Sequence, residues 1–530
     1  MSDQPAVPVP PAAPAVPPPA FSHREKIVVL VGLMLGMFLA ALEQTIIATA
    51  LPRIAADLGG AEHLSWIVSS YLLTSTAVTP IYGKLSDLYG RKIMLQTAIG
   101  VFLLTSLLCG FADSMGQLIA FRALQGLGGG GLLAMAHATI ADIISPRERG
   151  RYQGYIASVF AAASVTGPVL GGLFAEHLGW PWIFWINLPI GLAALAVSQK
   201  ALARLRPRRL RHRIDYMGAV LIVAAVTCIL LVTTMGGNEL AWTSPAIAGL
   251  AAAAAALLIL SILQERRAPE PILPPRLFRN RTYVVVIVIN LLVALVMIGG
   301  LIFLPLFLQM VYGLTSGDAG LMLIPLSGFT VAGAITAGRL VSRTGRYKIF
   351  PLIGFSLAAT ALLLLSTVTA ATPLWLTGLF MAVNGYGIGL VMPVMLVAVQ
   401  NAVEPRDMGV GTASVSFFRT MGGSFGVALF GAVLIARLDH RFAGLPGGTG
   451  LAEALGGSPG AALLHAGHGA LDSLPSALHP AAAAAIGGAF HELFWLGAAI
   501  AVVALAVVAQ LREIPLRETA AAAEPAPGDD

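Results

Sequence analysis

Long apolar segments alternate with short polar segments over most of the 530 residues. Each apolar segment is close to the ~20 residues that an α-helix needs to cross a bilayer. The pattern therefore predicts an all-α polytopic membrane protein. Fourteen spans are predicted, at residues 27–50, 64–82, 93–111, 117–141, 153–175, 181–199, 216–236, 244–263, 283–311, 318–340, 348–368, 373–399, 410–435 and 487–510.

The composition excludes a soluble protein. Apolar residues make up 57% of the chain and charged residues only 11%, which is too little charge to cover a water-exposed surface. The net charge of +6 comes from short basic clusters between apolar segments, so no nucleic-acid surface is expected. The first twenty residues are rich in Pro and Ala and contain no Lys or Arg. They predict a disordered tail and do not match a signal peptide.

The basic residues predict the orientation of the chain in the membrane. If the N-terminus is cytoplasmic, the 32 Lys and Arg residues fall in cytoplasmic segments with five exceptions. Arg53, Arg437 and Arg441 lie outside, and Arg122 and Arg419 lie within spans. Because basic residues concentrate on the cytoplasmic side, both termini are expected to be cytoplasmic.

An internal repeat predicts two related halves. "GKLSDLYGRK" (83–92) ends the second span and "GRLVSRTGRYK" (338–348) ends the tenth, with Gly, a base, Leu and Gly-Arg at matching positions. The second copy has Ser342 where the first has Asp87. The expected organisation is a tail at 1–24, a six-helix bundle at 25–200, an inserted two-helix segment at 201–281, a second six-helix bundle at 282–512 with an external loop at 439–486, and a tail at 513–530.

The first copy of the repeat is a candidate gating contact. Gly83 and Gly90 permit close helix approach and a tight reversal. Arg91 and Lys92 follow the cytoplasmic basic bias, whereas Asp87 does not. An acid at a helix boundary can cap another helix or pair with a base, and such a contact can form in one conformation and break in another.

These residues resemble the major facilitator superfamily, whose loop between spans two and three reads G-x-L-[SA]-D-x-x-G-R-[KR]. Further stretches, such as "LEQTIIATALPRI" (42–54), "LIAFRALQGLGGGG" (118–131) and "RIDYMGAVL" (213–221), look like the fourteen-span drug:proton antiporters of the EmrB/QacA type. The resemblance covers about residues 25 to 435. It implies two six-helix bundles plus two inserted helices, export of small molecules in exchange for protons, and no cofactor.

A buried acid and a buried base are the candidate coupling residues. Glu43 lies sixteen residues into the first span, about 24 Å along the helix, and Arg122 enters the fourth span at a similar depth. Unpaired charge in a membrane is costly and usually marks function. Gln125 is a second polar residue at this level. The alternative is a static salt bridge. The resemblance implies that the acid of span one and the Arg of "FRALQG" take part in coupling.

"GPVLGG" in the fifth span predicts close helix packing. Gly167, Gly171 and Gly172 allow helices to touch, and Pro168 predicts a kink. The resemblance implies an antiporter motif at the interface of the two halves, although Ala163 replaces a Gly of the longer family pattern. Generic helix packing is the alternative.

Three further polar residues are secondary candidates: His137, Asp142 and Arg419. His137 is interpreted as a hydrogen-bonded structural residue in preference to a proton shuttle, and Arg419 as a side chain that extends toward the cytoplasm. The His residues of segment 439–486 show no metal-ligand spacing, so no metal site is expected.

The sequence favours proton-coupled export of hydrophobic or amphiphilic, often cationic, compounds. It contains no G-x-x-x-x-G-K-[ST] loop for ATP, so an ion gradient is the expected energy source. A dedicated exporter of a metabolite, lipid or siderophore is the alternative, whereas a membrane enzyme would need clustered catalytic side chains. The expected partners are drugs or amphiphiles, protons and the lipid bilayer of a bacterial plasma membrane, without nucleic acid. The expected state is a monomer, joined by a periplasmic adaptor if the source has two membranes.

Overall fold

The computed structural model describes residues 23–59, 63–144, 146–202, 215–237, 240–444, 460 and 479–516. Regular structure within these ranges is helical, apart from one isolated bridge between Gly236 and Leu240. Four predicted features lie wholly or largely outside the described residues: the N-terminal tail, the basic connection after residue 202, most of segment 439–486 and the tail beyond residue 516.

The first bundle, here called the N-terminal bundle, consists of seven helices. Their bounds are α1 His23–Leu58, α2 Leu64–Tyr89, α3 Arg91–Cys109, α4 Met115–Ile143, α5 Pro146–His177, the short α6 Trp182–Trp185 and α7 Asn187–Ala201. The inserted pair follows as α8 Tyr216–Met235 and α9 Pro245–Arg267.

The second bundle, here called the C-terminal bundle, begins after a connection that contains the 3-10 turn η2 Leu277–Arg279. Its helices are α10 Arg281–Tyr312, the short α11 Ser316–Leu321, α12 Ile324–Thr344, α13 Ile349–Leu365, α14 Leu374–Ala402, α15 Met408–Ala443 and α19 His479–Ala509, with η3 Pro405–Asp407 before α15.

Helices occupy every apolar segment that the sequence predicts as a span, but not all of them qualify as spans. Among the described residues, twelve helical segments are long and apolar enough to cross a membrane. The other two long segments are α2, which carries many Ser and Thr side chains, and α13, which has 17 residues. The predicted count of fourteen spans is therefore not confirmed.

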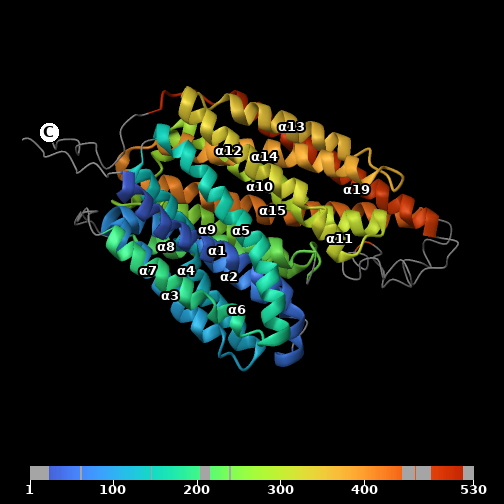
Figure 1. Ribbon diagram of the computed structural model, residues 1–530, viewed down its shortest axis with the longest axis horizontal. Coiled ribbons are helices and arrows are strands. Elements are labelled where there is room, and N and C mark those ends of the chain that lie inside the picture. Colours follow the sequence, from blue (N-terminus) through green and yellow to red (C-terminus); the bar gives the residue numbers. More distant parts are fainter. Residues whose placement is uncertain are drawn as a thin grey trace, which may run out of the picture.

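Each bundle has its own apolar core. In Figure 1 the blue-to-green N-terminal helices and the yellow-to-red C-terminal helices form two adjacent groups. Two clusters of buried apolar side chains lie almost entirely within α1–α7, and two more lie almost entirely within α10–α19. The bundles meet mainly where α2 packs on α15 and where α5 packs on α12. A fifth cluster joins α8 to α2 and α15, so the inserted pair covers one of these seams.

One end of the molecule collects basic side chains and is here called the basic end. The helices that finish at this end include α2, α4, α9, α12 and α14. The helices that begin there include α1, α3, α5, α8, α10, α13 and α15. The contacts Lys26–Glu148, Lys84–Glu270 and Arg276–Asp407 tie neighbouring connections together at this end.

The segment 439–486, predicted as an external loop, is helical at both of its ends. Helix α15 continues to Ala443, and α19 already begins at His479. The extension of α15 is stabilised by charge, because Arg437 and Arg441 both pair with Glu492 of α19, at 2.8 Å and 2.5 Å. Apolar periodicity alone did not reveal the polar end of α15 or the alanine-rich start of α19.

Candidate functional site

A buried ion pair lies inside the N-terminal bundle. Arg122 of α4 donates a hydrogen bond from Nη1 to Oε1 of Glu43 on α1, and both side chains are about 99% buried. Arg122 also donates from Nε to the carbonyl oxygen of Ile67 at 3.0 Å and from Nη1 to Oε1 of Gln125 at 2.5 Å. The structure thus brings together the three residues that the sequence selected for coupling.

Two further polar residues complete the shell of Glu43. Asn187, the first residue of α7, donates from Nδ2 to Oε2 of Glu43 at 2.6 Å. The amide of Gln125 donates to Oγ of Ser106 on α3 at 2.6 Å, and Asn187 also reaches Ser106 at 3.3 Å. Both carboxylate oxygens of Glu43 therefore accept hydrogen bonds. A buried carboxylate needs such partners to remain ionised in an apolar interior.

An aromatic face covers the arginine of this pair. The guanidinium of Arg122 lies 4.4 Å from the ring centroid of Tyr71 on α2, a cation–π contact. Glycines of α4 make the approach possible, because a Cβ on Gly129 would lie 2.3 Å from the hydroxyl of Tyr71. A Cβ on Gly126 would likewise lie 2.5 Å from the carbonyl oxygen of Tyr71. The glycine-rich run after Arg122 thus places α2 directly against the charge.

Sequence reasoning missed Asn187, Ser106 and Tyr71. "WINLPIG" was noted only as part of the family resemblance, although the Asn in this apolar stretch carried a signal. A polar amide in an apolar span requires a buried partner, and Glu43 is that partner. Ser106 and Tyr71 carried no comparable signal, because hydroxyl side chains are frequent in the apolar segments of this chain.

The predicted gating residues form a second charged cluster at the basic end. Asp87, near the end of α2, accepts hydrogen bonds from the backbone N–H groups of Gly409 at 3.0 Å and Val410 at 3.2 Å. These N–H groups belong to the first turn of α15, where the helix lacks internal acceptors. A carboxylate of the N-terminal bundle therefore caps a helix of the C-terminal bundle.

Arg91 holds this carboxylate in place from the N-terminal side. It pairs with Asp87 at 2.6 Å and with Asp142 of α4 at 2.7 Å, and it donates to the hydroxyl of Ser86. Gly90 reverses the chain with φ of 93°, a conformation that favours glycine. Lys92, the next residue after Arg91, is half-buried at the start of α3.

Gly83 allows the two bundles to touch beside this cluster. A Cβ at Gly83 would lie 2.6 Å from Cβ of Ala413 and 2.8 Å from the carbonyl oxygen of Gly409. Both contacts are shorter than real side chains tolerate, so only glycine fits here. The close approach of α2 and α15 depends on this position.

The glycines of "GPVLGG" do not all pack as predicted. A Cβ on Gly167 would lie 2.0 Å from Oγ1 of Thr45, and one on Gly171 would lie 2.3 Å from the carbonyl oxygen of Ile46. Both glycines therefore pack on α1 within the N-terminal bundle, although α5 also contacts α12. The prediction for Gly172 is wrong, since a Cβ there would meet no atom within 4 Å. The side chain of Pro168 lies outside the described residues.

The remaining candidates lie where the bundles meet. His137 of α4 is buried, with Nδ1 2.9 Å from the carbonyl oxygen of Leu133, a contact consistent with its structural interpretation. Gln400 of α14 donates to the carbonyl oxygen of His137 at 3.4 Å, and it also donates to Thr412 at 3.3 Å. Arg419 of α15 is half-buried.

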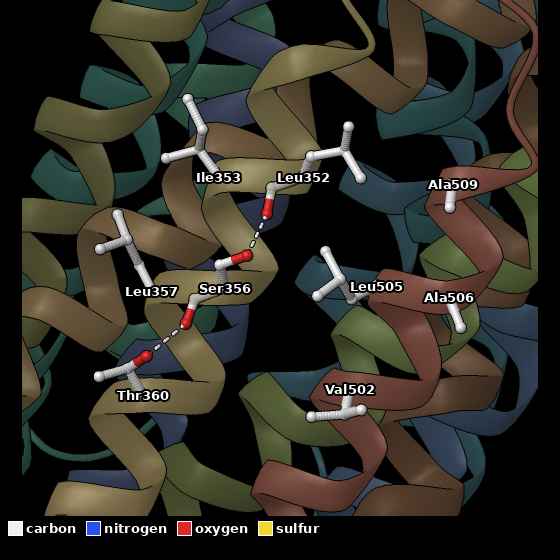
Figure 2. Close-up of a pocket in the computed structure, with 9 residues that line it drawn as sticks. All are labelled: Leu352, Ile353, Ser356, Leu357, Thr360, Val502, Leu505, Ala506 and Ala509. Atoms are coloured by element: carbon white, nitrogen blue, oxygen red, sulfur yellow. Dashed lines mark hydrogen bonds between the residues drawn. The ribbon is translucent and has the colours of Figure 1, made fainter.

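An apolar groove of about 640 Å³ lies between α13 and α19 (Figure 2). Its hydroxyl groups are occupied, because Ser356 donates to the carbonyl oxygen of Leu352 and Thr360 to that of Ser356, both at 2.9 Å. The groove offers no charged group for recognition. It is lined by Leu352, Ile353, Ser356, Leu357, Thr360, Val502, Leu505, Ala506 and Ala509.

The described residues contain no group of three or more His, Cys, Asp or Glu side chains that could hold a metal ion. The two charged clusters make ion pairs and hydrogen bonds. An ion pair can be broken by protonation of its acid, and a capped helix end can be released when its carboxylate withdraws.

Comparison with known proteins places this chain in a family. The model of the Major Facilitator Superfamily matches residues 33–427. An uncharacterized MFS-type transporter of Mycobacterium tuberculosis is 39% identical over 501 residues, which cover 94% of this chain and 71% of the relative. The multidrug transporter protein MdtP of Bacillus subtilis is 37% identical over 415 residues, which cover 78% of this chain and 76% of the relative.

A solved structure shows the same fold at low sequence identity. The human organic anion transporter MFSD10 superposes with a TM-score of 0.61 at 13% identity, covering 91% of this chain and 99% of that protein. The sequence match, the close relatives and the shared helical fold agree. The chain belongs to the Major Facilitator Superfamily.

Proposed function

We propose that this protein is a proton-coupled efflux transporter that exchanges protons for hydrophobic or amphiphilic, often cationic, compounds. The observation that carries the proposal is the buried Glu43–Arg122 pair in the interior of the N-terminal bundle. Relatives named as multidrug transporters support the substrate class. We further propose the fourteen-span EmrB/QacA arrangement, with α2 and α13 as spans, both termini cytoplasmic and the basic end facing the cytoplasm.

Protonation of Glu43 would change the forces inside the bundle. A neutral Glu43 no longer attracts Arg122 as an ion, and Arg122 then retains the carbonyl of Ile67, Gln125 and the ring of Tyr71 as partners. These partners lie on α2 and α4, whereas Glu43 lies on α1. Proton binding would thereby loosen α1 from α4, which gives the proton a route to helix movement.

The Asp87 cap supports alternating access at the basic end. In this conformation the carboxylate of α2 holds the first turn of α15, and Gly83 lets the backbones touch. Opening at the basic end would require both contacts to break. We propose that this contact stabilises the conformation that is closed at the basic end.

Transport into everted membrane vesicles tests the proposal. Vesicles with an imposed pH gradient should accumulate a fluorescent cationic amphiphile when they contain the wild-type protein, and an uncoupler should abolish this uptake. Glu43→Gln should lose most gradient-driven uptake. The matched control is Glu492→Gln, which alters a glutamate of α19 in the C-terminal bundle, away from the Glu43–Arg122 pair, and should transport normally.

The outcomes separate the candidate functions. Uptake that an uncoupler leaves unchanged would rule out proton coupling. Coupled transport of one metabolite, lipid or siderophore, together with no activity on a panel of unrelated amphiphiles, would replace multidrug efflux by a dedicated exporter. In either case, a loss of transport in Glu43→Gln that Glu492→Gln does not share would assign a role in transport to Glu43.

A further inference from the structure

The inserted helix pair contains two acidic residues that meet at the basic end. Asp215 directly precedes α8, and Glu265 lies in the last turn of α9. Asp215 caps α8, because its Oδ1 accepts the backbone N–H of Gly218 at 2.9 Å. The same oxygen accepts the amide of Gln264 at 2.9 Å, which ties the start of α8 to the end of α9.

The second carboxylate oxygen of each acid lies beside Gly218 of α8. Oδ2 of Asp215 and Oε1 of Glu265 are buried and have no hydrogen-bond partner among the described residues. A Cβ on Gly218 would lie 2.3 Å from Oδ2 of Asp215 and 3.0 Å from Oε1 of Glu265. Both carboxylate oxygens therefore lie close to the backbone of Gly218 in α8. The side chain of Glu265 belongs to a residue that is only 6% exposed.

Among the described residues, one cation faces this pair. The other oxygen of Glu265 accepts the backbone N–H of Leu273 at 3.1 Å. Lys84 of α2 is the cation that faces Glu265, but its ammonium group already pairs with Glu270 at 2.5 Å. Toward α8, helix α15 presents the apolar side chains of Phe417 and Met421, and α2 presents Ala77.

Two carboxylates that both lie against Gly218, with Glu265 buried and Asp215 half-buried, are unfavourable neighbours when both are ionised. A single proton between them removes the repulsion and gives each unpartnered oxygen a hydrogen bond. A metal ion would need further ligands, and the described residues offer no group of three that could supply them. We propose that Asp215 and Glu265 share one proton, so that the inserted pair carries a proton-binding site separate from Glu43.

A short connection links this proton site to the contact between the bundles. Residues 268–280, here called the strap, run from α9 to α10. In the strap, Leu273 bonds to Glu265, Glu270 pairs with Lys84 beside Asp87, and Arg276 donates to both oxygens of Asp407, at 3.1 Å and 2.8 Å.

The far end of the strap is held by an arginine that stays charged. The hydrogen bonds that Arg276 donates to Asp407 raise the pKa of Arg276. Asp407 directly precedes α15, whose first turn Asp87 caps. Loss of the shared proton adds a negative charge that competes with Glu270 for Lys84. Proton occupancy therefore acts on the strap near Lys84, where α2 meets α15.

Infrared spectroscopy of the full-length protein in detergent, titrated over pH, tests the site without any transport assay. The measurement uses a background with Glu43→Gln and Asp87→Asn, so that neither of these acids contributes a carboxyl signal. A protonated-carboxyl C=O band should be present near neutral pH and should disappear as the pH rises. Glu265→Gln should abolish the band, whereas Glu492→Gln should leave it unchanged. Asp215→Asn should lower the midpoint by about one pH unit or more, because the repelling charge is removed.

Thermal stability over the same pH range gives a second measurement. A proton that is bound in the folded state and lost on unfolding stabilises the protein at low pH, and this stability is lost as the pH rises. Glu265→Gln should remove this part of the pH dependence, since its amide can donate to Asp215 without a proton.

Three results would overturn the proposal. They are a band that survives Glu265→Gln, an unchanged midpoint in Asp215→Asn, and a Glu265→Gln protein that cannot fold at any pH. The last result would mean that the ionised carboxylate itself is required. None of these readouts depends on what the protein transports, so failure here is distinct from failure of the proposed antiport.

Discussion

The two bundles differ in how they use polar groups in their interiors. The N-terminal bundle buries an ion pair, Glu43 with Arg122, and surrounds it with amide and hydroxyl partners. The buried polar groups of the C-terminal bundle include the neutral amides of Asn290 and Asn384. Asn290 bonds within its own helix, to the carbonyl oxygen of Val286 at 2.9 Å. The interior of the N-terminal bundle thus holds a charged pair, where Asn290 and Asn384 of the C-terminal bundle supply neutral amides.

The repeated turns show the same difference at the basic end. In the first copy, Asp87 reaches across the interface to the backbone of α15. In the second copy, the hydroxyl of Ser342 is buried without a hydrogen-bond partner among the described residues. The turn after α12 instead binds its own bundle, because Tyr347 contacts the segment that follows α19. A shared sequence pattern therefore supports a contact between bundles in one half and a contact within a bundle in the other.

The largest effect is expected for Asp87→Asn. The amide keeps the volume but removes the charge that accepts two helix N–H groups, and hydrogen bonds to a charged group contribute about 1.5–3 kcal/mol. Export should fall at least about tenfold, since 1.4 kcal/mol corresponds to a factor of ten. The measurement is drug resistance of cells that contain equal amounts of each protein in the membrane.

Ser342→Ala is the matched control at the corresponding position of the second copy. It removes a hydroxyl group that makes no hydrogen bond in the described structure, so resistance should equal that of the wild type. Wild-type resistance in Asp87→Asn would contradict the gating role. An equal loss in both variants would mean that the two turns are not functionally different.

Much of the fold could be predicted from the sequence, because a helix that crosses a membrane needs a long run of apolar residues. Helices were found in every predicted apolar segment, yet α2 and α13 did not meet the criteria for spans. Helices α15 and α19 extend beyond the predicted spans, because the last turn of α15 is polar and pairs with Glu492, and the first turns of α19 are rich in alanine. Such tertiary pairing leaves no periodic trace in the sequence.

The candidate site was predictable only in part. Depth along two helices was sufficient to bring Glu43 and Arg122 to the same level, and the structure shows them in contact. The sequence does not predict which face of a helix packs against its neighbours, so the predicted helix contact at Gly172 was wrong. The pairing of Lys84 with Glu270 was also missed, because it joins residues 186 positions apart and Glu270 lies outside the helices.

The largest effect on stability, as opposed to export, is expected for the buried ion pair that distinguishes the N-terminal bundle. Arg122→Ala leaves the carboxylate of Glu43 without its cation, which should cost about 3–5 kcal/mol. Adding Glu43→Gln should restore part of this loss, because the remaining group is then neutral. The thermal stability of both single variants and the double variant in detergent measures the coupling. Strictly additive effects would show that the pair does not stabilise the bundle as an ion pair.

A smaller effect is expected for Gly83→Ala. The new methyl group would meet Ala413 and the carbonyl oxygen of Gly409, so α2 and α15 must separate by a few tenths of an ångström or more. The Asp87 cap should weaken and export should fall partially, while the protein still folds. Gly100→Ala is the control, because a Cβ there meets no atom within 4 Å. Full export by Gly83→Ala would show that tight contact between these helices is not needed for transport.

The smallest effect is expected for Tyr347→Phe in the turn that binds its own bundle. The hydroxyl of Tyr347 donates to the carbonyl oxygen of Arg512 at 3.0 Å and accepts the N–H of Ile514 at 2.9 Å. Its loss should cost about 1–2 kcal/mol and loosen residues 511–516, which limited proteolysis can measure. The backbone N–H of Tyr347 still donates to Glu513, so the segment should not detach completely. Export should stay at the wild-type level because none of these bonds crosses to the N-terminal bundle. A loss of export as large as that of Asp87→Asn would instead assign a gating role to the second turn.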